Sequence, residues 1–433
     1  MIPLLMSDLS GAVLATAHLP QTQTGLLNEV LAFVRREAPR LAAAPELTLQ
    51  TALNFSRPGS ALAGLASARL AAIAATKPTS VALAVTGGRH EIMFQRLNVP
   101  GPTRVLCSLV GHAHYVVDLD FASDQRRLLS ASKDGTCRIW DIETVSELAF
   151  LRGHEGPVLS AQFDPEGGRV ASCGEDGHVR VWDSGSGLET AGLNLNAGLV
   201  YWVRWSPDGA RLAASCENGS VAILSVAASS AADGAVSLGS VAVLRVGSVP
   251  VYSCAWGPAG TAAAGNLVAC DKSGAVALFG SKGDTFTQEA RDGGGSVACS
   301  VTYAPNGKVL FVGSYDHTIH VLDASTLDTL STVNGGFGWV YRVACCDTGS
   351  KLLIGHRSVA PSLATVNGTD VRVTAQLYGH RSFVSGVAFA RGSNMFATGS
   401  EDRTINVWSV SKDGGGAWQG RIRDSSQSDP PIM

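Results

Sequence analysis

Short runs of Val, Leu, Ile and aromatic residues alternate along most of the chain with turns that contain Gly, Pro, Asp or Asn. This pattern predicts many short β-strands rather than long helices. The pattern also repeats about every 40 to 45 residues. Residues 111–141 and 153–183 each hold a Gly-His pair, an apolar run, a Ser-containing run that ends in an Asp-Gly turn, and a Trp-Asp pair. A third copy runs from Gly379 to Trp408, with Ser409 in place of the Asp.

Four weaker copies lie between the second and third clear ones. Each keeps an alternating first strand but loses the signature residues; these strands are Val200–Trp205, Val251–Trp256, Ala298–Tyr303 and Val340–Cys345. Three of them are followed by a turn such as Ser206-Pro207-Asp208-Gly209. In such a turn Pro fixes φ and Gly permits a positive φ. The sequence therefore predicts seven strand-rich units after residue 110.

The Gly-His and Trp-Asp pairs at this spacing resemble the WD40 repeat family, and the resemblance covers about residues 103 to 410. It implies an all-β propeller of four-stranded blades. In WD40 proteins a His, a Ser or Thr, an Asp and a Trp form a buried, hydrogen-bonded tetrad. By resemblance the members are His112, Ser130, Asp134 and Trp140; His154, Ser172, Asp176 and Trp182; and His380, Thr398, Asp402 and Trp408. A buried carboxylate is costly unless donors surround it, so we interpret these sets as structural and not as catalytic triads.

The number of blades stays open between seven and eight. The pattern over residues 47–110 indicates a degenerate first blade, with a helical insertion around 61–75, a hairpin over 81–97 and an outer strand from Thr103 to Leu109. The ordinary length of the connection over 98–102 favours this eight-bladed interpretation. If the outer strand pairs with the last blade instead, seven blades close the ring by strand exchange between the two ends of the chain.

We accordingly divide the chain into an N-terminal extension (1–46), the degenerate first blade (47–110), seven WD40-like blades (111–423) and a polar tail predicted to be disordered (424–433). The extension contains apolar residues at helical spacing, which predict a short amphipathic helix: Leu26, Leu27, Val30, Leu31 and Val34. This helix packs on the propeller in the simpler interpretation and docks a partner in the other.

Composition excludes several classes of protein. The net charge of −3 offers no overall basic field for nucleic acid. No apolar run is long enough to cross a bilayer, and the first residues carry no basic segment of the secretory type. The nine cysteines are odd in number and lie mostly in strand-like runs, which indicates reduced, buried thiols. We expect an intracellular, cytoplasmic protein, with the nucleus, the cilium and organelles left open.

One narrow face of a propeller is built from the loop before the first strand of each blade and from the turn between its second and third strands. The positions that flank the start of each first strand are unusually aromatic for a chain with 6% aromatic residues. We predict that they form a partner-binding face: Tyr115, Tyr201, Trp202, Tyr252, Trp339, Tyr341, Arg342 and Phe383. Tyr, Trp and Arg dominate interface energies, although several of these side chains could instead point inward as core residues.

The neighbouring turn residues carry charges of both signs: Lys133, Glu175, Glu217, Lys272 and Glu401, with Tyr315 among them. Mixed charge favours a protein segment over a phosphate-rich ligand. The leading hypothesis is a non-catalytic scaffold that mediates protein–protein interactions in a multi-subunit complex. The alternative is an RNA-associated subunit of a ribonucleoprotein. The sequence predicts no catalytic residue, metal, cofactor, small-molecule substrate or membrane partner, and it leaves the complex unidentified.

Overall fold

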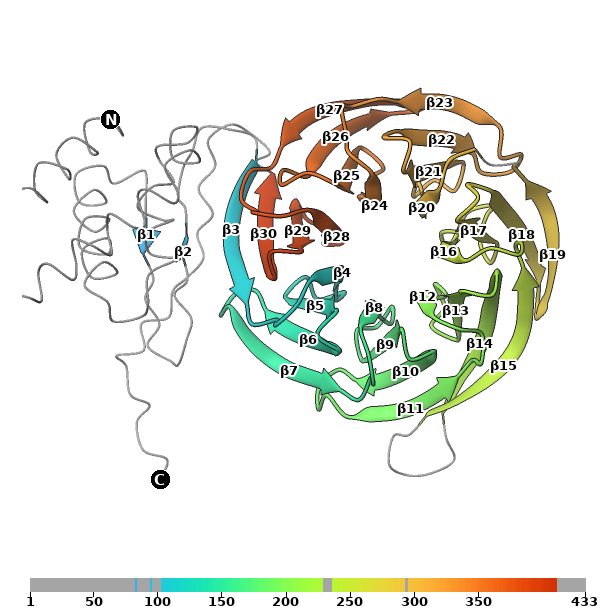
Figure 1. The fold of residues 1–433 in the computed structure, drawn as a ribbon, viewed down its shortest axis with the longest axis horizontal. Coiled ribbons are helices and arrows are strands. Elements are labelled where there is room, and N and C mark those ends of the chain that lie inside the picture. The colour runs from blue at the N-terminus through green and yellow to red at the C-terminus, as the bar shows by residue number, and fades with distance from the viewer. Residues whose placement is uncertain (1–81, 84–93, 96–102, 229–235, 293–294, 411–433) are drawn as a thin grey trace, which may run out of the picture.

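Each repeat folds as an antiparallel sheet of four strands, and the first strand of every sheet lies nearest the axis of a ring (Figure 1). The computed structural model describes residues 82–83, 94–95, 103–228, 236–292 and 295–410. Within this part of the chain seven such sheets, here called blades 1 to 7, close the ring around a central channel. The chain is thus an all-β, seven-bladed propeller.

The strands have the following bounds. Blade 1 comprises β4 (Val116–Phe121), β5 (Arg127–Ser132), β6 (Thr136–Asp141) and β7 (Ser146–Arg152). Blade 2 comprises β8 (Val158–Phe163), β9 (Arg169–Gly174), β10 (His178–Asp183) and β11 (Glu189–Asn194). Blade 3 comprises β12 (Val200–Trp205), β13 (Arg211–Cys216), β14 (Ser220–Ala228) and β15 (Val236–Arg245). Blade 4 comprises β16 (Val251–Trp256), β17 (Leu267–Asp271), β18 (Val276–Lys282) and β19 (Thr285–Arg291).

The remaining blades follow the same order. Blade 5 comprises β20 (Ala298–Tyr303), β21 (Val309–Ser314), β22 (Ile319–Asp323) and β23 (Thr329–Val333). Blade 6 comprises β24 (Val340–Cys345), β25 (Lys351–His356), β26 (Ser362–Asn367) and β27 (Asp370–Gln376). Blade 7 comprises β28 (Val384–Phe389), β29 (Met395–Ser400), β30 (Thr404–Val410) and, as its outer strand, β3 (Thr103–Val110).

The ring closes through β3, which corrects the eight-bladed interpretation. β3 runs antiparallel to β30, with Leu109 opposite Ile405, so it completes blade 7 and does not belong to a separate first blade. Leu109 is buried in the core between blades 7 and 1, together with Val116 and Ile405. The physical reason is that β30 would otherwise present an unpaired edge, and pairing it satisfies its backbone groups.

Little of the N-terminal region can be compared with the predictions. β1 (Ala82–Leu83) and β2 (Phe94–Gln95) pair antiparallel as a two-stranded sheet, which is the pairing expected for a hairpin over 81–97. The amphipathic helix at 26–34, the helical insertion at 61–75 and the tail at 424–433 lie outside the described residues. The described part of the chain contains no apolar helix of the length needed to span a bilayer.

A bulge near the start of each innermost strand decides where its side chains point. In blade 3 the register shifts between Val200 and Trp202, so the intervening Tyr201 has no partner on β13. The same shift occurs in the innermost strand of every blade of the described ring. A bulge re-aims the side chain of its extra residue. The second residue of each innermost strand is therefore displaced from the ladder, next to the face formed by the preceding loops.

Candidate functional site

The structure brings the members of the first two tetrads together. In blade 1, Nδ1 of His112 lies 2.8 Å from Oδ2 of Asp134, and its Nε2 lies 2.7 Å from Oγ of Ser130. Nε1 of Trp140 donates to the same Oγ at 2.8 Å. Blade 2 repeats these contacts at 2.9, 2.8 and 2.8 Å for His154, Ser172, Asp176 and Trp182. Each network joins the second and third strands of its blade, the turn between them and the loop before the innermost strand.

The third tetrad is in blade 7. His380 contacts Asp402 at 3.1 Å and Thr398 Oγ1 at 2.8 Å, and Trp408 Nε1 donates to the same Thr398 oxygen at 2.8 Å. Burial alone would raise the pKa of Asp402, but the donors at His380 and Thr404 hold this pKa well below its usual value. The histidine and tryptophan side chains are almost fully buried. The networks thus act as internal braces, and no substrate could reach the hydroxyl of Ser or Thr within them.

Aromatic side chains gather at one end of the channel, on the face formed by the loops before the innermost strands and by the turns between second and third strands. We call this the aromatic face; its members are Tyr115, Tyr201, Tyr252, Tyr315, Trp339, Tyr341 and Phe383. Tyr201 and Tyr252 meet edge to face with ring centroids 5.1 Å apart. Trp339 stacks on Tyr315 at 4.9 Å, and Tyr341 meets Tyr315 edge-on at 6.0 Å. Such packing restricts the movement of these rings.

Arg357 extends the aromatic face from blade 6 to blade 7. Its Cζ atom lies 4.4 Å from the ring centroid of Trp339 and 5.3 Å from that of Phe383. The sequence analysis missed Arg357, although it occupies in blade 6 the turn position that Lys133 and Glu401 occupy in blades 1 and 7. The signal that identifies Arg357 is its place at this turn position in the weak copy that forms blade 6.

Two residues predicted on this face are elsewhere. Trp202 is 4% exposed and lies in the channel, where the Cζ atoms of Arg204 and Arg342 lie 3.6 and 3.3 Å from its ring centroid. The bulge explains the correction. The bulge turns the second residue of each innermost strand toward the aromatic face. The third residue, which is Trp202 in blade 3 and Arg342 in blade 6, lies in the channel.

Charges of both signs surround the aromatic face. Burial raises the pKa of Tyr201 to about 12, and the carboxylates of Glu217 and Glu175 act in the same direction. Lys133 lies 5.9 Å from the ring centroid of Tyr115, and Arg357 supplies a second positive charge. The face therefore combines apolar anchors with both cationic and anionic side chains.

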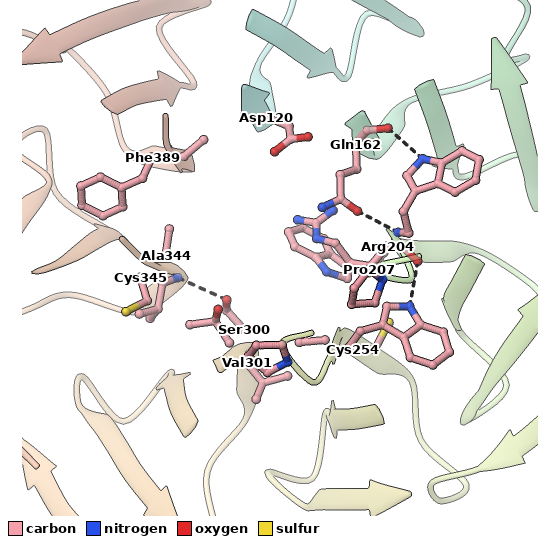
Figure 2. A pocket seen from close by; sticks show the side chains of 18 of the residues that line it. Asp120, Gln162, Arg204, Pro207, Cys254, Ser300, Val301, Ala344, Cys345 and Phe389 are labelled. Atoms are coloured by element: carbon pink, nitrogen blue, oxygen red, sulfur yellow. Dashed lines mark hydrogen bonds between the residues drawn. The ribbon is translucent and has the colours of Figure 1, made fainter. Parts of the chain in front are cut away.

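A cavity of about 520 Å³ opens at the other end of the innermost strands (Figure 2). Its polar lining includes Asp120, Gln162, Arg204 and Arg342. Oδ2 of Asp120 accepts the backbone N–H of Phe163 at 2.9 Å, and Oε1 of Gln162 accepts that of Trp205 at 2.8 Å. These bonds run from one blade to the next, so the cavity wall also joins the blades. In the described part of the chain, no three His, Cys, Asp or Glu side chains are grouped to hold a metal ion.

Asp120 makes the stability of the ring depend on pH. Burial raises its pKa from 3.8 to about 7; Asp118 acts in the same direction, whereas Arg204 and Arg391 lower it. Between pH 4 and 7 the folded chain therefore holds more of the Asp120 proton than the unfolded chain does, and the contribution of Asp120 to the free energy of unfolding falls as the pH rises. We expect Asp120→Asn, which keeps an acceptor for Phe163, to stabilise the protein by about 2 kcal/mol at pH 8 and to leave stability unchanged at pH 4. Urea unfolding at both pH values measures the difference, and equal effects at both would contradict it.

Comparison with known proteins agrees with this architecture. The family model described as "WD domain, G-beta repeat" matches residues 103–141, 145–183, 193–225, 286–323 and 371–409. The Target of rapamycin complex subunit LST8 of Saccharomyces cerevisiae is 34% identical over 104 residues, which cover 24% of this chain and 33% of the relative. The Ribosome biogenesis protein YTM1 of Lodderomyces elongisporus is 35% identical over 107 residues, which cover 23% of this chain and 21% of the relative.

Protein hir1 of Aspergillus terreus is 26% identical over 167 residues, which cover 36% of this chain and 15% of the relative. The chain thus matches a third or less of the length of these three relatives. The first and last matched repeats both contain strands of blade 7, as expected where the two ends of a chain share one blade. The five matched repeats, the three tetrads and the ring of seven blades in the described residues agree, and the chain therefore belongs to the WD40-repeat family.

Proposed function

We propose that this protein is a non-catalytic scaffold inside the cell, and that it holds a segment of another protein on the aromatic face. The observation that carries the proposal is the two groups of packed aromatic rings at one end of the channel. Tyr201 with Tyr252, and Tyr315 with Trp339 and Tyr341, are packed against one another without being fully buried. Anchors that are rigid before binding lose little conformational freedom on binding.

Exposure and charge support this use of the face. Trp339 is 37% exposed although it stacks on Tyr315, and a tryptophan left open to water is better explained by a partner than by stability. Glu175 and Glu217 lie on the side of Tyr201, whereas Arg357 lies on the side of Trp339. A peptide segment with an apolar anchor and charges of both signs fits this arrangement.

The relatives support the broader class of the proposal. LST8 is named as a subunit of the target of rapamycin complex, and YTM1 as a ribosome biogenesis protein. The first name describes that relative as a subunit of a complex, and the second connects that relative with the making of ribosomes. Because the matches cover only part of each relative, neither complex is assigned to this protein.

An RNA-associated role is the second candidate, since aromatic rings also stack on unpaired bases. The carboxylates at Glu175 and Glu217, which act on Tyr201, disfavour it because they repel phosphate. This charge pattern favours a protein partner.

Affinity purification of the tagged full-length protein from its own cells tests the proposal. The purification is run at low and high salt, with and without ribonuclease, and the bound proteins are identified by mass spectrometry. We expect a defined set of proteins that survives high salt and ribonuclease. Loss of that set after ribonuclease treatment would support the RNA-associated role instead.

A further inference from the structure

We propose that the cavity at the end of the channel opposite the aromatic face binds a small organic oxyanion, a molecule in which a phosphate or carboxylate is joined to an apolar group. This site is separate from the aromatic face and does not depend on the function proposed above. Three observations carry the inference: a guanidinium without a hydrogen-bonded counter-ion, an unusual stack that fixes its position, and the shape and chemistry of the cavity.

The guanidinium belongs to Arg342, whose Nε atom is buried without a hydrogen-bond partner among the described residues. Burial lowers the pKa of Arg342 to about 10, so the group still carries its charge at neutral pH. The carboxylate whose charge acts on it is Asp118, but this group is already engaged. Asp118 Oδ2 accepts from Ser160 Oγ at 2.7 Å and from the backbone N–H of Ala161 at 3.2 Å, and it lies 3.4 Å from Nη1 of Arg204. Arg342 is partly buried, so its charge is incompletely solvated, its Nε has no hydrogen-bonded acceptor in the described part of the chain, and an anionic ligand would offset that cost.

Trp202 holds the two arginines in place. Its ring centroid lies 3.6 Å from Cζ of Arg204 in its own blade and 3.3 Å from Cζ of Arg342 in blade 6. Blades 3 and 6 are not neighbours in the ring, so this contact crosses the channel. Side chains at the third position of other innermost strands bond to the next blade instead; Ser253, for example, accepts the backbone N–H of Val301 at 3.3 Å. The stack is thus not required by the repeat, and it positions two cations at one cavity.

The cavity suits a small organic molecule. Its volume of about 520 Å³ lies within the range of sites for small ligands. The residues that line the cavity include Phe163, Trp205, Trp256 and Phe389. A guanidinium offers paired donors that match the oxygens of phosphate or carboxylate. Arg342 therefore defines the anionic end of the ligand, because Nη1 of Arg204 already contacts Asp118 and Ser160, and the aromatic residues of the lining define its apolar end.

Calorimetric titration of the full-length protein at pH 8 tests this site. The probes are phenyl phosphate and benzoate, which distinguish phosphate from carboxylate, with sodium chloride added to keep the ionic strength constant. We expect saturable binding of at least one probe with a stoichiometry of one per chain. Failure of both probes to bind saturably would overturn the inference.

Variants locate the bound probe. Arg342→Gln is expected to weaken binding by about tenfold or more. Arg357→Gln is the matched control, because Arg357 also stacks on a tryptophan of blade 6 but at the aromatic face, and it should change the affinity by less than about twofold. Asp120→Asn removes a negative charge from the cavity and should tighten binding at pH 8.

Arg342→Gln should weaken probe binding and Asp120→Asn should tighten it, so a general loss of folded protein cannot explain both results. If Arg342→Gln fails to fold, as judged by circular dichroism, Arg342→Lys retains the charge but not the planar fork, and it should still bind more weakly than the original protein. Equal affinities for the original protein, Asp120→Asn and the folded Arg342 variant would place the probe elsewhere and contradict the proposal.

Discussion

Replacing Trp182 with Ala is expected to lower the free energy of unfolding by about 4 kcal/mol. The side chain is 1% exposed and packs in the core between blades 1 and 2. Its Nε1 donates to Ser172 Oγ at 2.8 Å, and the same oxygen lies 2.8 Å from His154. The substitution therefore leaves a large cavity and also weakens the network that makes the buried Asp176 tolerable. Urea unfolding followed by circular dichroism measures the loss.

Trp339→Ala is the matched control for this prediction. It removes the same side chain from a site that is 37% exposed, so we expect a loss below about 1 kcal/mol. A loss for Trp182 no larger than that for Trp339 would show that the tetrads do not brace the blades.

The triple replacement of Tyr201, Trp339 and Phe383 with Ala is expected to weaken partner binding by at least about 100-fold while the ring stays folded. These side chains lie in three different blades and none is fully buried. Their loss removes the anchors of the aromatic face but leaves the cores between the blades intact. Titration of the partner identified by purification measures the affinity, and circular dichroism confirms the fold.

A second triple variant controls for the loss of exposed apolar surface. Phe150, Leu188 and Tyr378 are 42%, 68% and 66% exposed and lie outside the aromatic face, so replacing them with Ala should leave the affinity within about twofold. Unfolding of the first triple variant would identify its side chains as core residues, and equal affinities for both variants would remove the aromatic face as the binding site.

Much of the fold could be predicted because the signals for each strand and turn lie within a few residues of one another in the sequence. The first strands expected for the four weak copies have the same bounds as β12, β16, β20 and β24. Alternation with a period of two and the turn residues determine such strands within a few residues of sequence. The tetrads could be assigned for the same reason, since His154, Ser172 and Trp182 occupy fixed places within one repeat.

The number of blades could not be predicted from local pattern. The alternation within Thr103–Val110 indicates a strand but does not say which sheet it joins, and its partner Thr404–Val410 is almost 300 residues away. The strand joins the last blade because β30 would otherwise have an unpaired edge, and that need arises only when the whole ring closes.

The candidate sites were only partly visible for similar reasons. The bulge at Tyr201 cannot be recognised from the alternation of apolar and polar residues, so Tyr201 and Trp202 were predicted on the same face. The stack of Arg342 on Trp202 joins blades 6 and 3, and no spacing within a repeat predicts a contact across the channel.

Photo-crosslinking from defined positions tests the central claim most directly, because it reports where the partner lies. A benzophenone amino acid is placed at Trp339 on the aromatic face, at Pro258 beside the opposite cavity, and at Tyr378 as an exposed control. The account predicts a crosslink to a polypeptide from position 339 and none from positions 258 or 378. A crosslink only from position 258, or a crosslinked product from position 339 that ribonuclease degrades, would contradict it.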